Sequence, residues 1–411
     1  MKRVAITGLG IVAPNGVGVD DFWQNCRAGV SGISKIDSFD TSEYPVKIAG
    51  VVRNFDPAEH MPRKLIDRSD RFVHFGCAAA TMALKDASLH ESQDWRDEAA
   101  VIIGSSLGGQ MFHEESISRG LRDNLKGMGP NSVPGVMPSA VAAHIAIMNG
   151  LRGPNLCLST ACSSGANAVG EAFRRIRSGD CAVVVSGGVE APVTPFCFYA
   201  HCALRVLSTS LGAPEGVSKP FDVERSGFVM GEGGAILVLE DLERARARGA
   251  HIYAEIVGFG SNSGAYHIAI PDPSAKDLVR VMTSALKSAG VEPEQIDYVN
   301  AHGTATRAND QVEVLGLEKV FESHMERLLI SGSKSMFGHT LGAAGAIEAA
   351  ICALSLRDQV APPTINLTKP EFRYDFVPNQ ARKARLNYVM SNSFGFGSNN
   401  SCLVFRRYDE N

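Results

Sequence analysis

Apolar segments of strand length alternate with amphipathic segments of helical length along the chain. The runs "AAVIIGSS" (99–106) and "GGAILVLED" (233–241) are largely apolar, whereas "VGEAFRRIRSG" (169–179) spaces its apolar residues for one face of a helix. Strands that lack a polar face are buried between helices, most often in parallel sheets. The pattern therefore predicts an α/β protein whose mainly parallel sheets are covered by helices.

The alternation occurs twice, with similar sequences in similar places. "ALKDASL" (83–89) is matched by "ALKSAGV" (285–291), and a β-type run follows each. The first strands, "RVAITGLG" and "AEIVGFGS", correspond in the same way, as do the last, "GGAILVLED" and "SNNSCLVFRR". Such internal similarity indicates a duplicated unit. We predict two α/β halves, residues 1–250 and 251–411, that pack as one body because no low-complexity linker separates them.

Two segments stand apart from this repeat. A charged helix ending at Gly249 marks the junction of the halves, and its arginines suit a helix C-terminus. Residues 107–150, with Gly, Pro and Met beside an apolar helix, have no counterpart in the other half. We expect this insertion to cap a pocket or to form a subunit interface.

The segment "GLGIVAPNGVG" (8–18) contains part of a dinucleotide-binding fingerprint. A third glycine is missing at the required offset, and Pro14 stands where the helix would open. We therefore favour a tight turn after the first strand.

Composition and charge exclude several classes of protein. The net charge of −4 comes from interspersed acidic and basic residues, so we expect no nucleic-acid partner. The nine cysteines include no CxxC pair, which fits neither a disulfide framework nor a zinc site and indicates a reducing cytoplasm. No run approaches the roughly 20 apolar residues of a membrane span, so we expect a soluble protein without a membrane partner.

One cysteine stands at a position suited to chemistry. In "LSTACSSGANAVGEAF" (158–173), Cys162 follows an apolar, β-leaning run and precedes a helix that begins near Ser163 or Ser164. The positive end of a helix dipole favours the thiolate and lowers the pKa of a thiol. Cys162 is thus either an inert buried thiol, as most cysteines are, or a nucleophile with a lowered pKa.

Two histidines strengthen the second interpretation. His302 follows a predicted strand in "YVNAHGTATRAND", and His339 lies in "SKSMFGHTLGAAGAIEAA". Cys162 and His339 are each followed by Gly at +3 and by Glu at +9, so they occupy equivalent turns of the two halves. Together, Cys162, His302 and His339 would form a nucleophile with two partners for proton transfer or hydrogen bonding. Metal binding is the competing interpretation, and it lacks an HxH or HxxxH pair.

Four motifs together resemble one enzyme family. "TACSSG", "NAHGTAT", "KSMFGHTLGAAGAIE" and "SNSFGFGSNN" are similar to those of the β-ketoacyl-ACP synthases, closest to synthase II, and the similarity covers essentially the whole chain. The resemblance implies the thiolase fold, with two pseudo-repeated halves in a five-layered αβαβα core. It also implies a homodimer, an acyl carrier protein as partner, and no required cofactor, because the substrates are carried on the carrier's 4′-phosphopantetheine.

The resemblance implies a role for each motif. Cys162 would take the acyl group from the carrier, and His302 and His339 would act on malonyl-ACP in a decarboxylative Claisen condensation. Two neutral imidazoles that donate to the thioester oxygen would stabilise the enolate where its charge develops. Lys334 matches the active-site lysine of the family. Phe396 matches the gate, and its N–H, with that of Cys162, matches the oxyanion hole.

Further residues match the family's binding positions. They are Thr304 and Thr306 for the pantetheine arm, Leu107, His201 and Phe228 for the acyl pocket, Glu313 and Asp310 as supporting acids, and Asn300, Glu348, Ser391 and Asn392 for a monovalent cation.

The departures from the family concern the substrate. Arg307 and Asn309, in "HGTATRAND", resemble the ketosynthases of type II polyketide systems, which act with a chain-length-factor partner. His201 stands where an aromatic residue usually lines the acyl pocket, and a buried, unpaired imidazole is unfavourable. Either the acyl chain is unsaturated or oxygenated, or His201 faces a subunit interface and the enzyme makes ordinary fatty acids. The "GHTLG" context disfavours a degradative thiolase, and His339 disfavours synthase III. Cys162 disfavours a chain-length factor.

Overall fold

The computed structural model describes residues 1–89, 94–126 and 128–409, and it contains two sets of strands with the same order. Across the sheet the N-terminal set runs β6, β5, β7, β8, β1, and the C-terminal set runs β11, β10, β14, β15, β9. The N-terminal strands are β1 (Val4–Ala13), β5 (Ala100–Gly104), β6 (Asn155–Leu158), β7 (Val183–Glu190) and β8 (Gly233–Asp241). The C-terminal strands are β9 (Ala254–Ser263), β10 (Tyr298–Asn300), β11 (Leu329–Ser331), β14 (Tyr388–Gly395) and β15 (Asn399–Arg406).

The two sets are joined where β1 pairs with β9 over three residues of each strand. When the five strands of each set are numbered along the chain, both sets lie side by side in the order third, second, fourth, fifth, first. This equivalence confirms the prediction of two pseudo-repeated halves.

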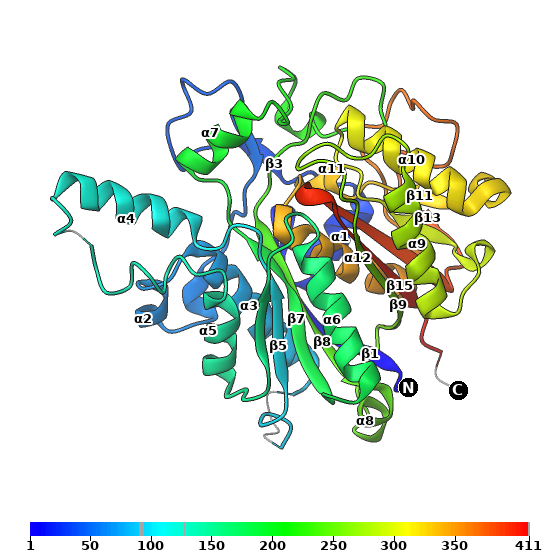
Figure 1. Cartoon of the computed structure of the whole chain (residues 1–411), viewed down its shortest axis with the longest axis horizontal. Coiled ribbons are helices and arrows are strands. Elements are labelled where there is room, and N and C mark those ends of the chain that lie inside the picture. Colours follow the sequence, from blue (N-terminus) through cyan, green and yellow to red (C-terminus); the bar gives the residue numbers. More distant parts are fainter. Residues whose placement is uncertain (90–93, 127, 410–411) are drawn as a thin grey trace.

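Helices form three layers around the two sets of strands (Figure 1). The outer face of the first set is covered by α3 (Arg71–Asp86) and α5 (Ala140–Asn149), and that of the second by α9 (Lys276–Ala289) and α10 (Arg307–Phe321). Between the sets lie α6 (Ser164–Ser178) and α12 (Ala344–Asp358). Sheets cover α12 on both sides, and its residues from Ala344 to Leu356 are all buried. The five-layered αβαβα core is confirmed.

The remaining α-helices and short strands lie around this core. They are the helices α1 (Val19–Ala28), α2 (Arg63–Ile66), α4 (Gln110–Arg122), α7 (Pro195–Ala203), α8 (Leu242–Ala247) and α11 (Lys334–Phe337), and the short strands β2 (Gly16–Val17), β3 (Ile33–Lys35), β4 (Ile48–Gly50), β12 (Val360–Ala361) and β13 (Arg382–Lys383).

The prediction of mainly parallel sheets is wrong, because the sheets are mixed. Only β5 with β6 and β7, and β10 with β11 and β14, pair in parallel along the main path. The pairs β7–β8, β8–β1, β1–β9, β9–β15 and β15–β14 are antiparallel. The apolar pattern could not reveal this, since a strand buried on both faces reads alike in either direction. The three residues between β14 and β15 permit only an antiparallel return.

The glycines of the partial dinucleotide motif serve helix packing. A Cβ on Gly10 would lie 1.9 Å from the carbonyl oxygen of Ala79 in α3. In the second half, a Cβ on Gly260 would lie 2.3 Å from the carbonyl oxygen of Val281 in α9. Both glycines lie inside strands, and the turn comes later, after Ala13. The dinucleotide interpretation is therefore excluded.

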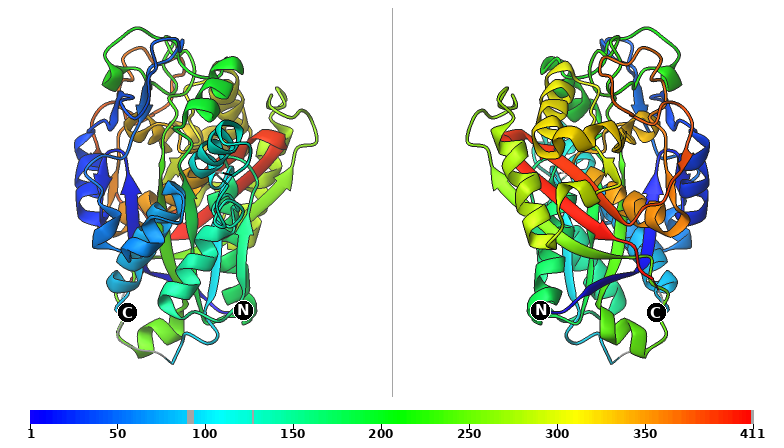
Figure 2. Two further views of the ribbon diagram at one scale, coloured as in Figure 1. Left: turned by 90° about the vertical axis from the view of Figure 1, so that its left-hand side faces the viewer. Right: turned by 90° about the vertical axis from the view of Figure 1, so that its right-hand side faces the viewer.

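The structure shows the predicted junction near Gly249 and the insertion at residues 107–150. α8 ends before Gly249, which adopts the left-handed conformation, and β9 begins at Ala254. α4 projects from the body of the molecule, and both termini lie at the end opposite α7, on different sides of the molecule (Figures 1 and 2). Among the described residues, no helix combines the length and apolar character needed to cross a membrane.

Candidate active site

Cys162 lies in a strained turn between the third strand of the first half and a middle-layer helix. β6 ends at Leu158 and α6 begins at Ser164, as the sequence predicts. Ala161, immediately before the cysteine, adopts φ 51°, a left-handed conformation that is unfavourable for a residue with a side chain. The Ser164 hydroxyl fixes this turn, since it accepts from the Thr160 N–H at 2.9 Å and donates to the Ala161 carbonyl at 2.6 Å.

The turns of Cys162 and His339 meet at the centre of the molecule. A Cβ on Gly165 would lie 2.8 Å from the carbonyl oxygen of Gly342, and each glycine stands three residues after its functional side chain. Only glycine allows the two middle helices to begin this close together. The equivalence seen in sequence therefore has a spatial consequence, because it brings both turns to one place.

The surroundings of Cys162 have opposite effects on the pKa of its thiol. Burial raises the pKa of the thiol to about 11, while the charge of Lys334 and the backbone N–H of Phe396 act in the opposite direction. The sequence predicts a lowered thiol pKa, and this prediction is wrong for the net effect. Only 8% of the residue is exposed, and burial outweighs the groups that lower the pKa. The N–H groups of Phe396 and of Cys162 itself both favour a negative sulfur.

His302 and His339 form a pair of neutral imidazoles. Their ring centroids are 5.3 Å apart and their planes are nearly perpendicular. Burial, followed by the charge of Lys334, lowers the pKa of each ring well below its ordinary value. Both rings are therefore uncharged at neutral pH, in the state required of hydrogen-bond donors to a developing enolate.

Lys334 fixes the tautomer of His302. Its ammonium lies 3.4 Å from His302 Nδ1, donates to the His302 carbonyl at 2.7 Å, and forms an ion pair with Glu348. An ammonium has only donors, so Nδ1 must accept and the ring proton must lie on Nε2. Only 1% of the lysine is exposed, which makes it part of the site rather than a surface charge.

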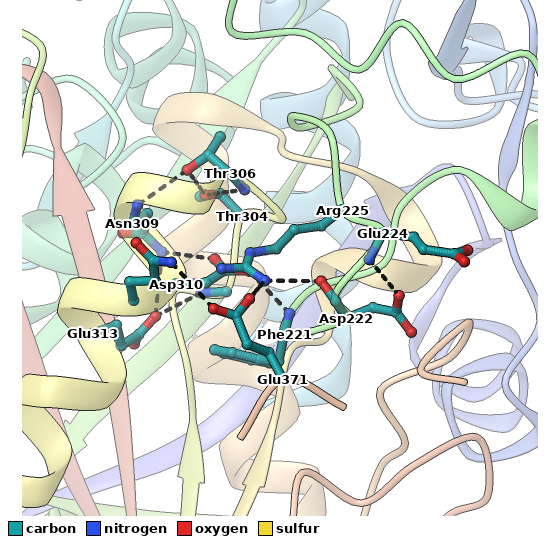
Figure 3. A network of polar contacts seen from close by, with 12 residues as sticks. Phe221, Asp222, Glu224, Arg225, Thr304, Thr306, Asn309, Asp310, Glu313 and Glu371 are labelled. Atoms are coloured by element: carbon teal, nitrogen blue, oxygen red, sulfur yellow. Dashed lines mark hydrogen bonds and ion pairs between the residues drawn. The ribbon is translucent and has the colours of Figure 1, made fainter. Parts of the chain in front are cut away.

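Glu313 and Asp310, on α10, hold the loop that carries His302. The carboxylate of Glu313 accepts from the N–H groups of His302 and Gly303, both at 2.8 Å. Asp310 accepts from the Phe221 N–H at 2.9 Å and lies 3.4 Å from the guanidinium of Arg225. Figure 3 shows this network, in which the buried Arg225 lies between acidic side chains of different segments.

One cavity of about 350 Å³ brings the predicted residues together. Its lining includes Cys162, His302, His339, Leu107, His201, Phe228, Thr304, Thr306 and Phe396. The Phe228 ring meets that of His339 edge-on at 5.1 Å and that of His201 edge-on at 6.5 Å, so it packs against both imidazoles. The predicted nucleophile, histidines, acyl pocket and gate are thus parts of one hollow.

His201 lies at the predicted acyl pocket and has a backbone hydrogen-bond partner. It lines the cavity, and its Nδ1 lies 2.9 Å from the backbone carbonyl of Cys197, one helical turn earlier in α7. A carbonyl can only accept, so the proton of this ring lies on Nδ1. Burial lowers the pKa of His201, which keeps the ring neutral.

The hydroxyls of Thr304 and Thr306 lie on another wall of the cavity, 2.9 Å apart. Thr306 caps α10 by accepting from the Asn309 N–H, and the Asn309 amide donates to Asp310 at 3.2 Å. Arg307 is exposed at the start of the helix. Asn309 therefore lines the cavity and bonds the acidic pair, whereas Arg307 is not among the described residues that line the cavity.

Phe396 begins a short, constrained loop at the mouth of the cavity. Gly397 adopts φ 74° and donates its N–H to the Ile268 carbonyl at 2.6 Å, and Ser398 adopts φ 57°. A Cβ on Gly395 would lie 3.1 Å from the Cys162 nitrogen. The two glycines thus differ in their roles, since Gly397 supplies the turn and Gly395 the close approach to the cysteine.

The four residues matched to a monovalent-cation site are all buried. Glu348 uses one oxygen for Lys334, while its other oxygen and the side-chain oxygen of Asn392 have no partner among the described residues. The side-chain oxygen of Asn300 accepts from Ser333 at 3.2 Å. Ser391 contacts Cys352. Within the described ranges, no cluster of three His, Cys, Asp or Glu side chains is suited to a metal ion.

The sequence interpretation missed two buried charged residues. Glu190, at the end of β7, accepts from the Ser106 and Leu107 N–H groups and, across the halves, from the Gly342 N–H at 3.0 Å. Arg225 anchors Asp310, as described above. A charge at the end of the apolar run "VVVSGGVE" was the available signal for Glu190, whereas nothing in the local pattern distinguishes Arg225 from a surface residue.

Comparison with known proteins identifies the family. A model described as the β-ketoacyl synthase N-terminal domain matches residues 1–245, and one described as the C-terminal domain matches residues 253–368. The 3-oxoacyl-[acyl-carrier-protein] synthase 2 of Coxiella burnetii is 43% identical over 408 residues, covering 99% of each chain.

Solved structures give the same result. The ketosynthase of a type II polyketide synthase, in complex with its acyl-carrier protein and bound to the hexaketide, matches with a TM-score of 0.92 and 33% identity, covering 99% of this chain and all of the other. The ishigamide ketosynthase/chain length factor matches with a TM-score of 0.92 and 34% identity over the same shares. This chain therefore belongs to the β-ketoacyl synthase family of acyltransferases.

Proposed function

We propose that this chain catalyses the decarboxylative Claisen condensation of a Cys162-bound acyl chain with malonyl-ACP, giving β-ketoacyl-ACP and CO₂. The observation that carries the proposal is the single cavity in which a thiol faced by two backbone N–H groups meets two neutral imidazoles and a buried lysine.

Acyl transfer to the enzyme is the first step. The Cys162 sulfur bonds to the acyl carbon, the carbon–sulfur bond to the carrier breaks, and the thiol proton ends on the carrier's thiol. The N–H groups of Cys162 and Phe396 favour negative charge beside the sulfur, and they are suited to the oxyanion of the tetrahedral intermediate. Because burial raises the thiol pKa to about 11, proton loss has to accompany the approach of the substrate.

Condensation follows at the histidines. The bond between the malonyl α-carbon and its carboxylate breaks, CO₂ leaves, and the electron pair is held as an enolate. His302 offers an Nε2–H to the enolate oxygen because Lys334 occupies Nδ1, and His339 is its neighbour. Each such donor is worth about 3 kcal/mol in the transition state. The enolate carbon then bonds to the acyl carbon, and Cys162 leaves as a thiolate that takes a proton from water.

The remaining site residues have supporting roles in this proposal. Thr304 and Thr306 bind the pantetheine arm, and Phe396 gates the cavity. Residues 1–250 supply the nucleophile, and residues 251–411 supply the histidines. A monovalent cation fits the region of Asn300, Glu348, Ser391 and Asn392, on the strength of two buried oxygens that lack partners among the described residues.

The partners and the location follow from the same proposal. An acyl carrier protein delivers both substrates, and a related ketosynthase is known in complex with one. We assign the chain to a homodimer, because apolar side chains are exposed on the insertion and β6 is an edge strand. The cytoplasm is the proposed location, because all nine cysteines are free.

A second candidate is the ketosynthase subunit of a specialised type II polyketide system, with a chain-length-factor-like partner in place of the second copy. His201 in the acyl pocket favours it, and the similarity to the ishigamide ketosynthase/chain length factor is consistent with it.

Separation of the two half-reactions tests the proposal. Cys162→Ala should abolish formation of the acyl-enzyme, detected by mass spectrometry, and should retain decarboxylation of malonyl-ACP, because the histidines act on the second substrate. Cys157→Ala, which removes a partly exposed thiol in β6, is the matched control and should leave both unchanged. Loss of decarboxylation in a folded Cys162→Ala protein would contradict the division of roles.

A further inference from the structure

His201 lies among apolar side chains in the cavity lining. Leu107, Val206, Phe228 and Leu341 line this hollow together with His201. Phe228 packs in the same apolar cluster as Cys162, and its ring lies 6.5 Å from that of His201, so an acyl chain that runs from Cys162 along Phe228 comes within reach of His201.

The contacts of His201 fix what its ring can offer a ligand. Nδ1 carries the proton, because it bonds to the Cys197 carbonyl at 2.9 Å and a carbonyl cannot donate. A neutral imidazole protonated on Nδ1 has a bare lone pair on Nε2. Nε2 has no hydrogen-bond partner among the described residues, so the acceptor is free.

A free acceptor discriminates among acyl chains. A saturated chain would displace water from Nε2 and leave it unpaired, which is unfavourable. A keto group is itself an acceptor and cannot pair with Nε2 either. A hydroxyl donates and satisfies the lone pair.

We infer that His201 makes this acyl pocket selective for chains that bear a hydroxyl group at the position that reaches His201 in α7. Such chains are preferred over saturated and keto chains of the same length. The inference rests on the proposed condensation and names the acyl substrate of that same site. This selectivity differs from a general preference for polar chains, because Nε2 of His201 favours a group that donates a hydrogen bond and disfavours one that only accepts.

The experiment measures condensation with malonyl-ACP for three sets of acyl-ACP of one length: saturated, hydroxylated at successive positions, and keto at the same positions. The wild-type protein should show kcat/KM about tenfold higher for the best hydroxylated chain than for its saturated and keto counterparts, equivalent to about 1.4 kcal/mol. His201→Phe should abolish this ratio, and His201→Gln, whose amide oxygen still accepts, should retain part of it. Tyr199→Phe, on the exposed side of the same helix, is the matched control and should keep the wild-type ratio.

A butyryl-ACP arm separates failure of the inference from failure of the proposed function. If the wild-type protein condenses no acyl chain, butyryl included, the proposed function is wrong. If it condenses butyryl but prefers saturated chains at every position, or if folded His201→Phe keeps the wild-type ratio, the selectivity is overturned. Should His201→Phe lose butyryl activity too, the His201→Gln ratio decides: a retained preference for hydroxyl supports the inference and a lost one overturns it.

Discussion

At the scale of single residues, burial decides the protonation of the site. The same desolvation that keeps His302 and His339 neutral raises the pKa of Cys162 to about 11. Lys334, buried in their midst, lowers the pKa of all three groups. Exclusion of water thus keeps the imidazoles neutral, as the proposed chemistry requires, but it also disfavours the thiolate of Cys162. In the proposed mechanism, substrate binding therefore has to accompany the loss of the thiol proton.

The pH profile of malonyl decarboxylation should reflect these neutral histidines. An ordinary histidine gains a proton as the pH falls through about 6.5. Because the pKa values of His302 and His339 are lowered, both rings stay neutral below that pH, and we expect decarboxylation by the Cys162→Ala protein to stay level from about pH 8 to about pH 6. The measurement is CO₂ release from malonyl-ACP, and a half-maximal rate near pH 6.5 would contradict the expectation.

At the scale of elements, buried carboxylates hold loops that follow strands. Glu313 accepts from the loop after β10, and Glu190 accepts from the equivalent loop after β5 and from Gly342 in the other half. The first holds His302 and the second holds Leu107, so each half uses one acid to fix one wall of the cavity.

Glu190 should make stability depend on pH. Burial raises the pKa of Glu190 to about 7, whereas in the unfolded chain it ionises near 4.5. The folded protein therefore keeps a proton that the unfolded chain loses, so this contribution is present below pH 4.5 and is lost as the pH rises through 7. Glu190→Gln should reduce the fall in the free energy of unfolding between about pH 5 and about pH 8 by on the order of 1 kcal/mol, measured by urea denaturation.

Glu243→Gln is the control for this experiment, since its carboxylate is largely exposed in α8. An identical pH dependence in the wild type and in Glu190→Gln would show that the buried acid does not retain its proton.

The loop from Phe396 to Ser398 should order the two half-reactions. Its ring stands at the cavity, and the Ser398 hydroxyl and the Gly397 N–H bind the neighbouring loop at His267 and Ile268. Phe396→Ala should raise malonyl decarboxylation before acylation several-fold, because the small side chain no longer obstructs the histidines. Phe196→Ala, an exposed ring on α7, is the control. Unchanged decarboxylation and unchanged condensation together would exclude gating.

At the scale of the whole molecule, the insertion leaves an apolar surface exposed. Four large apolar side chains are each at least 70% exposed: Leu121 near the end of α4, Leu125 and Val133 beyond that helix, and Ile147 in α5. Exposed apolar side chains of this size are typical of interfaces, so we expect a partner to cover them. The alternative expectation for the insertion was a cap over the pocket, and among its described residues only Leu107, at its start, lines the cavity.

Charge on this surface should dissociate the proposed homodimer. Leu121→Glu combined with Ile147→Glu places two carboxylates where a partner would bury them, so the mass measured by light scattering should fall from that of a dimer toward that of a monomer. Leu211→Glu, at a fully exposed residue elsewhere, should leave the mass unchanged. A wild-type protein that is monomeric, or a double variant that stays dimeric, would exclude this surface as the interface.

Much of the fold and part of the site are local properties of the chain. The duplication, the junction near Gly249, the turn of Cys162 before α6 and the equivalence of that turn with His339 can all be read from spacing, because the periods of strands and helices are short. Four motifs were enough to indicate the family, and the family models and relatives confirm it.

The tertiary structure alone decided the properties that depend on neighbours distant in sequence. Strand direction, the raised pKa of Cys162, the tautomers of His302 and His201, and the loop contacts of Glu190 and Arg225 each arise from groups far apart in the chain. Desolvation and hydrogen bonding act through space over a few ångströms, so no local sequence pattern encodes them. The sequence determined which residues stand at the ends of strands, and packing determined which of them share one cavity and in what state of protonation.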